Sequence, residues 1–182
     1  MAQFITVHEL SQYTVLSGNI DNDKISPFIK IAQDTHIYAF LGSKLFDKTS
    51  NEIDNNTLSG NYLNLVNNYV KPMLYHWALM EFIPFSGVVI SNKGTYQHNS
   101  ENATVTDSKA LELLVQKSKQ IAENYTEKFM KYMRINYGLF PEYYTVQYGD
   151  KPPALSTIPG GWYLPTTEIF QNELRQQQQQ PQ

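Results

Sequence analysis

The stretch that decides the fold is LELLVQKSKQIAENYTEKFMKYM, residues 111–133. Its apolar and small residues recur three or four positions apart, which is the spacing of one face of an α-helix. Thr106 or Asp107 is the expected N-cap of this helix, Gly138 its expected end, and Pro141 prevents it from resuming. The stripe consists of Leu111, Leu114, Val115, Ser118, Ile121, Ala122, Tyr125, Phe129, Tyr132 and Met133. A long helix with one such stripe needs partner helices to cover it.

Two earlier segments supply those partners. Ser26-Pro27 predicts the start of a helix, with a hydroxyl cap followed by proline in the first turn, and Gly42 predicts its end. After one short turn, the Asn-rich residues 49–61 predict a loop. A second pattern of helical spacing then runs from Tyr62 to Pro84.

Pro72 interrupts the second pattern, and because proline removes a backbone donor and clashes with the preceding turn, we expect a kink or restart at residues 68–71. After this helix the period changes. Residues 87–98 contain two short β-prone runs around Asn92-Lys93-Gly94, which predicts a hairpin.

These patterns predict a mainly α fold, a small bundle of three long helices with a projecting β-hairpin and extended N- and C-terminal arms. We expect an N-terminal arm at residues 1–23, a helical domain at 24–143 and an extended C-terminal docking arm at 144–182. Periodicity is lost from Tyr143 onward, so the C-terminal arm is not needed to close the core.

Composition excludes several classes of function. The formal charge of the 182-residue chain is -3, which gives no overall field that would attract nucleic acid or an anionic membrane. Without cysteine there is no disulfide, thiolate metal site or cysteine nucleophile. No apolar run approaches the ~20 residues of a membrane span, and the N-terminus lacks a signal-peptide pattern, so we expect no membrane association and synthesis in the cytoplasm.

Compact catalytic and cofactor motifs are absent from the sequence, and we predict no enzyme activity, catalytic residue, cofactor or metal. The four histidines, His8, His36, His76 and His98, are scattered along the chain. We interpret His36 and His76 as hydrogen-bonded core or interface residues. The alternative is an acid-base pair assembled from Asp34, Asp47 or Glu81.

Interaction surfaces are the more promising features. On the long helix Lys117, Lys128, Lys131 and Arg134 share one face, with Glu123 and Glu127 nearby. This face is either a solvated surface of mixed charge or a polar lining that faces DNA or a neighbouring subunit.

The C-terminal segment carries large apolar side chains between prolines and glycines, ahead of a glutamine run. One interpretation is a disordered, solubilising end. We favour a docking arm, because apolar anchors on a strand that does not fold alone are typical of partner binding. The anchors are Trp162, Tyr163, Leu164 and Phe170. The high content of 13 tyrosines is also typical of extensive protein interfaces.

Four stretches together resemble a known family: FIKIAQDTHIYAFLGSKLFDK, NYVKPMLYHWALMEFIPFSGVVISNKGTYQH, the apolar stripe of the long helix, and LFPEYY. In this order they resemble phage and prophage proteins of Bacteroidetes hosts that are related to the head-tail connectors of tailed phages, including the ring proteins of crAss-like phages. The resemblance covers about residues 20 to 145. It rests on order and spacing, since none of these stretches is a catalytic signature.

The resemblance implies a structural virion protein, located in the neck at the head-tail junction. It implies a homo-oligomeric ring, expected to have twelve copies, that joins the portal protein to the next neck or tail ring and extends the channel through which DNA passes without sequence-specific binding. The C-terminal arm would then contact the portal or a neighbouring subunit. The hairpin would contact the next ring through Asn92, Lys93, Gly94 and Tyr96.

Two other functions compete with this hypothesis. One is a cytoplasmic helical adaptor or regulatory binding module of phage origin, which would be free in the cell rather than inside virions. The other is an enzyme that uses the acid-base pair described above.

Overall fold

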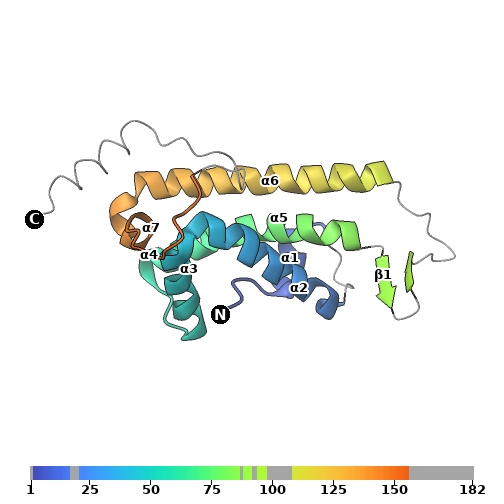
Figure 1. The fold of residues 1–182 in the computed structure, drawn as a ribbon, viewed down its shortest axis with the longest axis horizontal. Helices are drawn as coiled ribbons and strands as arrows, with labels where there is room; N and C mark the ends of the chain where they lie inside the picture. Colours follow the sequence, from blue (N-terminus) through green and yellow to red (C-terminus); the bar gives the residue numbers. More distant parts are fainter. Residues whose placement is uncertain (1, 17–20, 87, 92–93, 98–107, 156–182) are drawn as a thin grey trace, which may run out of the picture.

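The computed structural model describes residues 2–16, 21–86, 88–91, 94–97 and 108–155. The described chain is mainly helical, which confirms the predicted class. Figure 1 shows an elongated body with the longest helix, α6 (Ser108–Ile135), along its whole upper side. No helix in the described part is both long and apolar enough to span a membrane.

The central helix is α5 (Lys71–Phe82), which packs against α6 on one side and α2 (Asn22–Ala32) on the other (Figure 1). A helix enclosed in this way must be apolar all round rather than along one stripe. Its buried residues fit that requirement, since they occupy several faces: Met73, Leu74, Tyr75, Trp77, Ala78, Leu79 and Phe82.

The contact between α5 and α6 is close because α6 presents small side chains there. Ser118, Ala122 and Thr126 are buried one turn apart, and they leave room for the indole of Trp77. Trp77 Nε1 donates a hydrogen bond of 3.2 Å to Thr126 Oγ1, so the polar edge of this fully buried ring is satisfied. From Ser118 to Met133 the predicted stripe of the long helix therefore closes the core, whereas Leu114, nearer its start, is exposed.

The first predicted helix starts earlier than Ser26. The Asp21 side chain accepts a hydrogen bond of 3.1 Å from the backbone of Asp23 and caps α2, so Pro27 lies inside the helix. The helix continues through a π-turn, η1 (Gln33–Ile37), into α3 (Tyr38–Asp54).

Gly42 interrupts α3 with a non-helical backbone, φ 72° and ψ 164°, so a helix does end there as predicted. A new helical segment follows at once, and it extends to Asp54. The loop predicted at 49–61 is therefore wrong over its first six residues. The Asn-rich composition concealed a buried face that consists of Leu45, Phe46, Thr49 and Ser50.

The second predicted helix consists of α4 (Gly60–Leu65), the π-turn η2 (Val66–Val70) and α5. The π-turn lies directly before Lys71 and Pro72, where the break was expected. Its wider ring, with Lys71 N–H donating to Val66 C=O, accommodates the proline that an α-helical turn could not.

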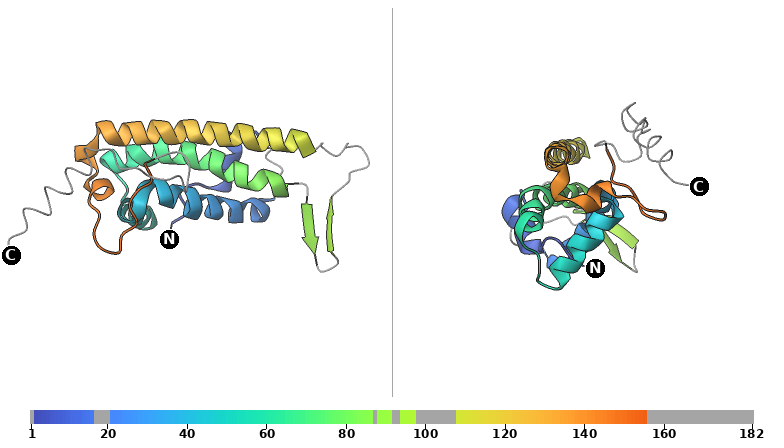
Figure 2. Two further views of the ribbon diagram at one scale, coloured as in Figure 1. Left: turned by 45° about the horizontal axis from the view of Figure 1, so that its top comes forward. Right: turned by 90° about the vertical axis from the view of Figure 1, so that its left-hand side faces the viewer.

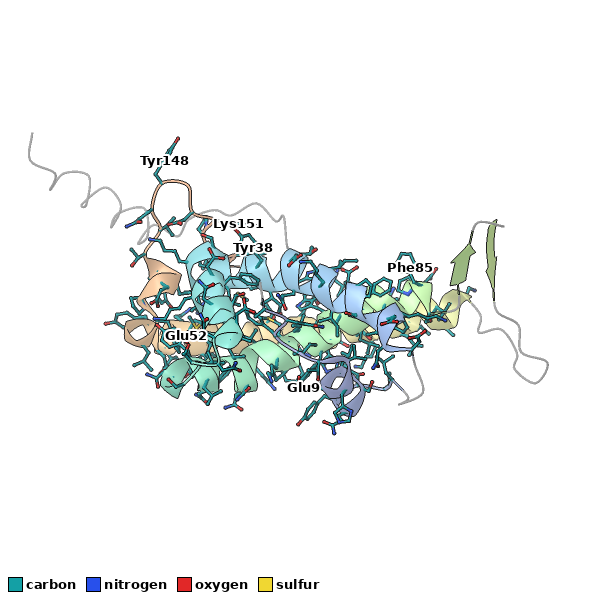
Figure 3. All side chains as sticks on the ribbon, turned by 90° about the horizontal axis from the view of Figure 1, so that it is seen from below. Glu9, Tyr38, Glu52, Phe85, Tyr148 and Lys151 are labelled. Carbon is teal, nitrogen blue, oxygen red and sulfur yellow. The ribbon has the colours of Figure 1, made fainter. Side chains whose placement is uncertain are left out.

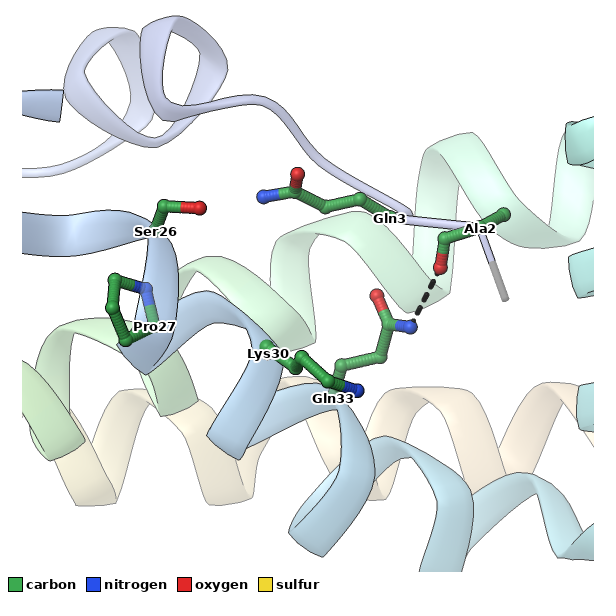
Figure 4. A pocket seen from close by; sticks show the side chains of 6 residues that line it. All are labelled: Ala2, Gln3, Ser26, Pro27, Lys30 and Gln33. Carbon is green, nitrogen blue, oxygen red and sulfur yellow. Dashed lines mark hydrogen bonds between the residues drawn. The ribbon is translucent and has the colours of Figure 1, made fainter. Parts of the chain in front are cut away.

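The predicted N-terminal arm, 1–23, needs correction, because its first part belongs to the core. Ala2, Phe4, Ile5 and Leu10 are buried. Gln33 donates a hydrogen bond of 2.8 Å from Nε2 to the carbonyl of Ala2 and accepts one of 3.0 Å from the Phe4 backbone (the bond to Ala2 is drawn in Figure 4). A short helix, α1 (Val7–Tyr13), follows and packs behind α5.

Two strands, β1 (Val88–Ser91) and β2 (Gly94–Gln97), pair antiparallel with Val88 opposite Gln97. They lie beyond the end of α5 and the short 3₁₀ turn η3 (Ile83–Phe85) (Figure 1). The residues between the strands, 92–93, lie outside the described part, as does the predicted cap of α6 at Thr106 or Asp107.

The chain leaves α6 through a 3₁₀ turn, η4 (Tyr137–Leu139), and a short helix, α7 (Pro141–Tyr144). Residues 145–155 then return across α3 without regular structure, and we call them the strap (Figure 2).

Candidate interaction surface

The outer face of α6 carries several exposed basic side chains. The helix has six basic and three acidic residues, whereas the whole protein has a formal charge of -3, so the remainder is acidic. Lys117, Lys128, Lys131 and Arg134 are all exposed. Within the described residues none of them forms an ion pair: Lys117 donates to Gln120 Oε1 at 3.0 Å, and Lys128 lies 5.0 Å from the ring centre of Tyr125. Whether this face meets DNA or a subunit stays a prediction.

Both ends of the elongated body carry exposed apolar side chains. At the end formed by η4, α7 and the start of the strap these are Ile135, Tyr137, Leu139, Tyr144, Val146 and Tyr148. At the opposite end, Phe85, Leu113 and Leu114 are exposed. Figure 3 shows Tyr148 and Phe85 near the two extremes of the molecule.

The strap is attached where Gly42 breaks α3. Ala154 N–H donates to the carbonyl of Ala39 at 2.8 Å, and Ser43 N–H donates to the carbonyl of Lys151 at 2.9 Å. A Cβ on Gly42 would lie 2.9 Å from Pro153 N and 3.0 Å from the Lys151 carbonyl oxygen. The positive φ and the close strap together explain why glycine occupies this position.

A polar cluster, the clamp, fixes α7 to the preceding helices. Glu142 in α7 accepts a hydrogen bond of 2.7 Å from Lys48 Nζ in α3 and one of 2.6 Å from Tyr62 Oη in α4. Lys48 Nζ also lies 4.1 Å from the ring centre of Tyr62. Burial raises the pKa of Glu142, but the hydrogen bonds from Lys48 and Tyr62 outweigh it, and the net pKa lies below the ordinary value. Glu142 is therefore ionised at neutral pH.

His36 has a carboxylate partner, which comes from another helix. Its Nε2 lies 2.9 Å from Glu81 Oε1, and its ring stacks on Trp77 with centroids 4.0 Å apart. Burial lowers the pKa of His36 against the opposing effect of Glu81. The side chain is buried and hydrogen-bonded, as interpreted, although Nδ1 has no partner among the described residues.

The other members of the proposed acid-base pair are not brought to His36. Asp34 forms an exposed ion pair of 2.7 Å with Lys30, and Asp47 is exposed on α3. Among the described residues, no three His, Cys, Asp or Glu side chains gather in a way that could hold a metal ion.

A shallow cavity of about 450 Å³ lies between the N-terminal segment and α2 (Figure 4). Its lining combines the Ala2 and Gln3 segment with Ser26, Pro27, Lys30 and Gln33. Gln33 already bonds to the N-terminal backbone, so the polar group at the base of this cavity is occupied by the chain itself.

Most of the predicted contact residues cannot be placed. Trp162, Tyr163, Leu164 and Phe170 lie outside the described residues, as do Asn92 and Lys93. Gly94 and Tyr96 are in β2, opposite Ser91 and Val89.

Comparison with known proteins identifies a family. Residues 37–153 match DUF6712, a family of unknown function. The chain belongs to this family. Curated proteins and solved structures gave no match.

The DUF6712 region starts at Ile37 and ends at Pro153. It contains α3 to α7, the clamp and the strap contacts at Gly42, and therefore extends past the domain boundary predicted at residue 143. The sequence interpretation missed the role of the strap. Residues 144–155 were assigned to the docking arm, because the groups of α3 that hold the strap lie about 100 positions earlier in the chain.

Proposed function

We propose that this protein is a head-tail connector ring subunit of a tailed phage, a structural virion protein of the neck. The observation that carries the proposal is the presence of exposed apolar side chains at both ends of an elongated helical body. Contiguous apolar surface on a soluble protein marks interaction sites. A subunit between a portal and a tail needs such sites at its upper and lower ends.

The outer face of α6 supports the same function. A ring subunit also needs a lateral contact and a surface toward the channel. The basic face has the charge for either of two neighbours, the acidic remainder of the next subunit or the DNA in the channel. Because Lys117, Lys128, Lys131 and Arg134 are exposed and form no ion pair within the described residues, their charges are available for such a neighbour.

The finer features of the hypothesis belong to the same proposal. The pair β1 and β2, at one end of the body, is the hairpin that contacts the next ring, through Asn92, Lys93, Gly94 and Tyr96. The residues after the strap are the docking arm, and the ring has twelve copies. No step of this function requires an active site, a cofactor or a membrane.

The test is to purify virions of the phage or induced prophage that encodes the chain and to quantify their proteins by mass spectrometry. We expect this protein in the particles at a copy number equal to that of the portal subunit, and immunogold labelling at the head-tail junction. If the protein is found only in the particle-free lysate, the connector function is wrong. That result would favour the cytoplasmic adaptor.

A further inference from the structure

A second cavity, which we call the tyrosine pocket, lies where α1, η2, α5 and α6 meet. It has a volume of about 500 Å³, within the range of ligand-binding cavities. Its walls include Tyr13 from α1, Asn67 and Asn68 from η2, Tyr75 and His76 from α5, and Tyr125 from α6. None of these residues has a role in the proposed contacts described so far.

The rings of the pocket are arranged in two stacked pairs. Tyr13 stacks on Tyr75 with centroids 5.1 Å apart, and His76 stacks on Tyr125 with centroids 5.5 Å apart. Tyr13 is 64% exposed, so one ring of its pair is open to a ligand. Aromatic walls of this kind bind other rings and prolines, which offer flat apolar surface at low entropic cost.

The polar groups of the pocket favour an uncharged chain segment. Glu9 and Lys71, at the same cavity, neutralise each other through an ion pair of 2.7 Å. The side-chain amides of Asn67 and Asn68 can donate to and accept from a peptide backbone. The ring of His76 stacks on Tyr125, and its Nδ1 is buried without a partner among the described residues.

The chain itself contains a segment of the required chemistry. Trp162, Tyr163, Leu164 and Pro165 are consecutive, uncharged, and begin seven residues beyond the strap. We propose that this segment of one copy docks into the tyrosine pocket of the neighbouring copy in the ring. The inference rests on the proposed ring function and names the partner of the docking arm.

The positions of strap and pocket favour a neighbouring copy. Lys151 of the strap and Glu9 of the pocket lie on opposite sides of the body in Figure 3, and Figure 2 separates the strap from α1 in the same way. Seven extended residues reach roughly 23 Å beyond Leu155. Half the circumference of a body two helices thick, with each helix about 10 Å across, is roughly 31 Å, which exceeds that reach for the chain's own pocket.

The strap and the tyrosine pocket lie on opposite faces of the body, which is also the arrangement that a ring requires. An arm that leaves one face and a pocket on the other make a head-to-tail contact, and repeated head-to-tail contacts close into a ring when the rotation permits. Each subunit then donates one arm and receives one, so weak contacts are multiplied around the ring.

The binding test uses the full chain with its own anchors removed, Trp162→Ala and Tyr163→Ala, and a fluorescent peptide of residues 156–171. We expect saturable binding by fluorescence anisotropy, weakened about tenfold or more by adding Tyr13→Ala. Tyr137→Ala is the matched control, because Tyr137 is similarly exposed, at 69%, but lies outside the pocket. Equal affinities for all these proteins would overturn the pocket assignment.

The second measurement decides whether the segment docks into the tyrosine pocket of its own copy or into that of a neighbouring copy. A photo-crosslinking residue replaces Tyr163 in the full chain, and copies of natural and ¹⁵N-labelled protein are mixed before illumination. Crosslinks from labelled to unlabelled copies at α1, α5 or α6 support the inference, and crosslinks only within a copy overturn it. If virions contain the protein but the peptide does not bind the tyrosine pocket, this inference alone is refuted. Absence from virions would refute the function instead.

Discussion

Gly42 combines a backbone conformation reserved for glycine with a close neighbour. Its φ of 72° and ψ of 164° lie in a region that other residues enter only with strain, and the strap lies within 3.0 Å of the position of a Cβ. Gly60 has a similar φ of 56°, but nothing would lie within 4 Å of a Cβ there. Both glycines have a positive φ, but only Gly42 is close to the strap. A substitution at Gly60 therefore measures the cost of backbone strain without a strap contact.

We expect Gly42→Ala to lower the free energy of unfolding by about 2 to 4 kcal/mol, because backbone strain adds to a displaced strap. Gly60→Ala is the matched control, with an expected loss of about 1 kcal/mol from strain alone. Urea denaturation of both variants measures the difference. Equal losses would mean that the strap contributes nothing at Gly42.

The sequence predicted that the helix breaks at Gly42, but it did not predict that the strap packs against the break. Glycine in a helical pattern indicates an end, and the helix does end at Gly42. Nothing in the local sequence shows that a segment more than 100 residues later occupies the break. Glu81 was among the candidate acid-base residues, but its pairing with His36 could not be predicted, because the two lie on different helices, 45 positions apart.

Among the elements, α7 depends most on a single polar cluster. A helix of four residues has no stability of its own. Burial of Tyr143 and Phe140 and the clamp at Glu142 attach it to the body. The strap begins at the end of α7, so the clamp also sets the direction in which the strap leaves.

We expect Glu142→Gln to lower the free energy of unfolding by about 1 kcal/mol at neutral pH, because it weakens two charge-assisted hydrogen bonds. The pKa of Glu142 is lowered by folding, so the stabilisation is complete above the ordinary value of 4.5 and is lost as pH falls through the folded-state pKa. Thermal unfolding between pH 7 and pH 3 should therefore show a smaller acid loss for the variant.

Glu112→Gln removes an exposed charge near the start of α6, at the other end of the body from the clamp, and serves as the control. It should leave the acid loss unchanged. If Glu142→Gln lost as much thermal stability between pH 7 and pH 3 as the wild type, the clamp would make no contribution to the acid sensitivity.

At the level of elements, helices with a continuous apolar pattern were predictable, and so was the break before Pro72, since both follow from local chemistry. The short helix α1 was missed, although Thr6 and Glu9 form a capping box that the sequence displays. Its burial could not be predicted, because seven residues form a helix only when they pack on a surface made by distant ones.

For the whole molecule, the folded unit ends at the strap rather than at Tyr144. The strap contributes the two backbone hydrogen bonds at Ala39 and Ser43 and an ion pair of 3.2 Å between Lys44 and Asp150. Residues 156–182, which include the proposed docking arm, lie outside the described residues. Whether the folded unit is stable without the proposed docking arm can be tested by truncation.

We expect a chain truncated after Leu155 to keep the unfolding midpoint of the full protein and to lose ring assembly. Truncation after Tyr144 removes the strap and should lower the free energy of unfolding by about 2 kcal/mol, at about 1 kcal/mol for each lost backbone bond. Urea denaturation and native mass spectrometry check the two effects. Equal stability of both truncations would place the strap outside the folding unit.

On the sequence side, the proposed function rests on the resemblance and on the composition of the C-terminal segment. The exposed apolar ends and the unpaired basic face add physical support, because both depend on which side of each helix the core leaves uncovered. Residue spacing identifies an apolar stripe but does not show how much of it a partner helix covers. Leu113 and Leu114 illustrate this, since they are exposed in the described body.

The break at Gly42 also has a mechanical consequence. In a continuous helix the Ala39 carbonyl would accept its hydrogen bond from Ser43 N–H, and these are the two groups that the strap now satisfies. If tension on the C-terminus pulled the strap away, the two groups could bond to each other once Gly42 became helical. That change would reorient the two segments of α3, whose residues on both sides of the break are buried, so the strap also holds the bend between them.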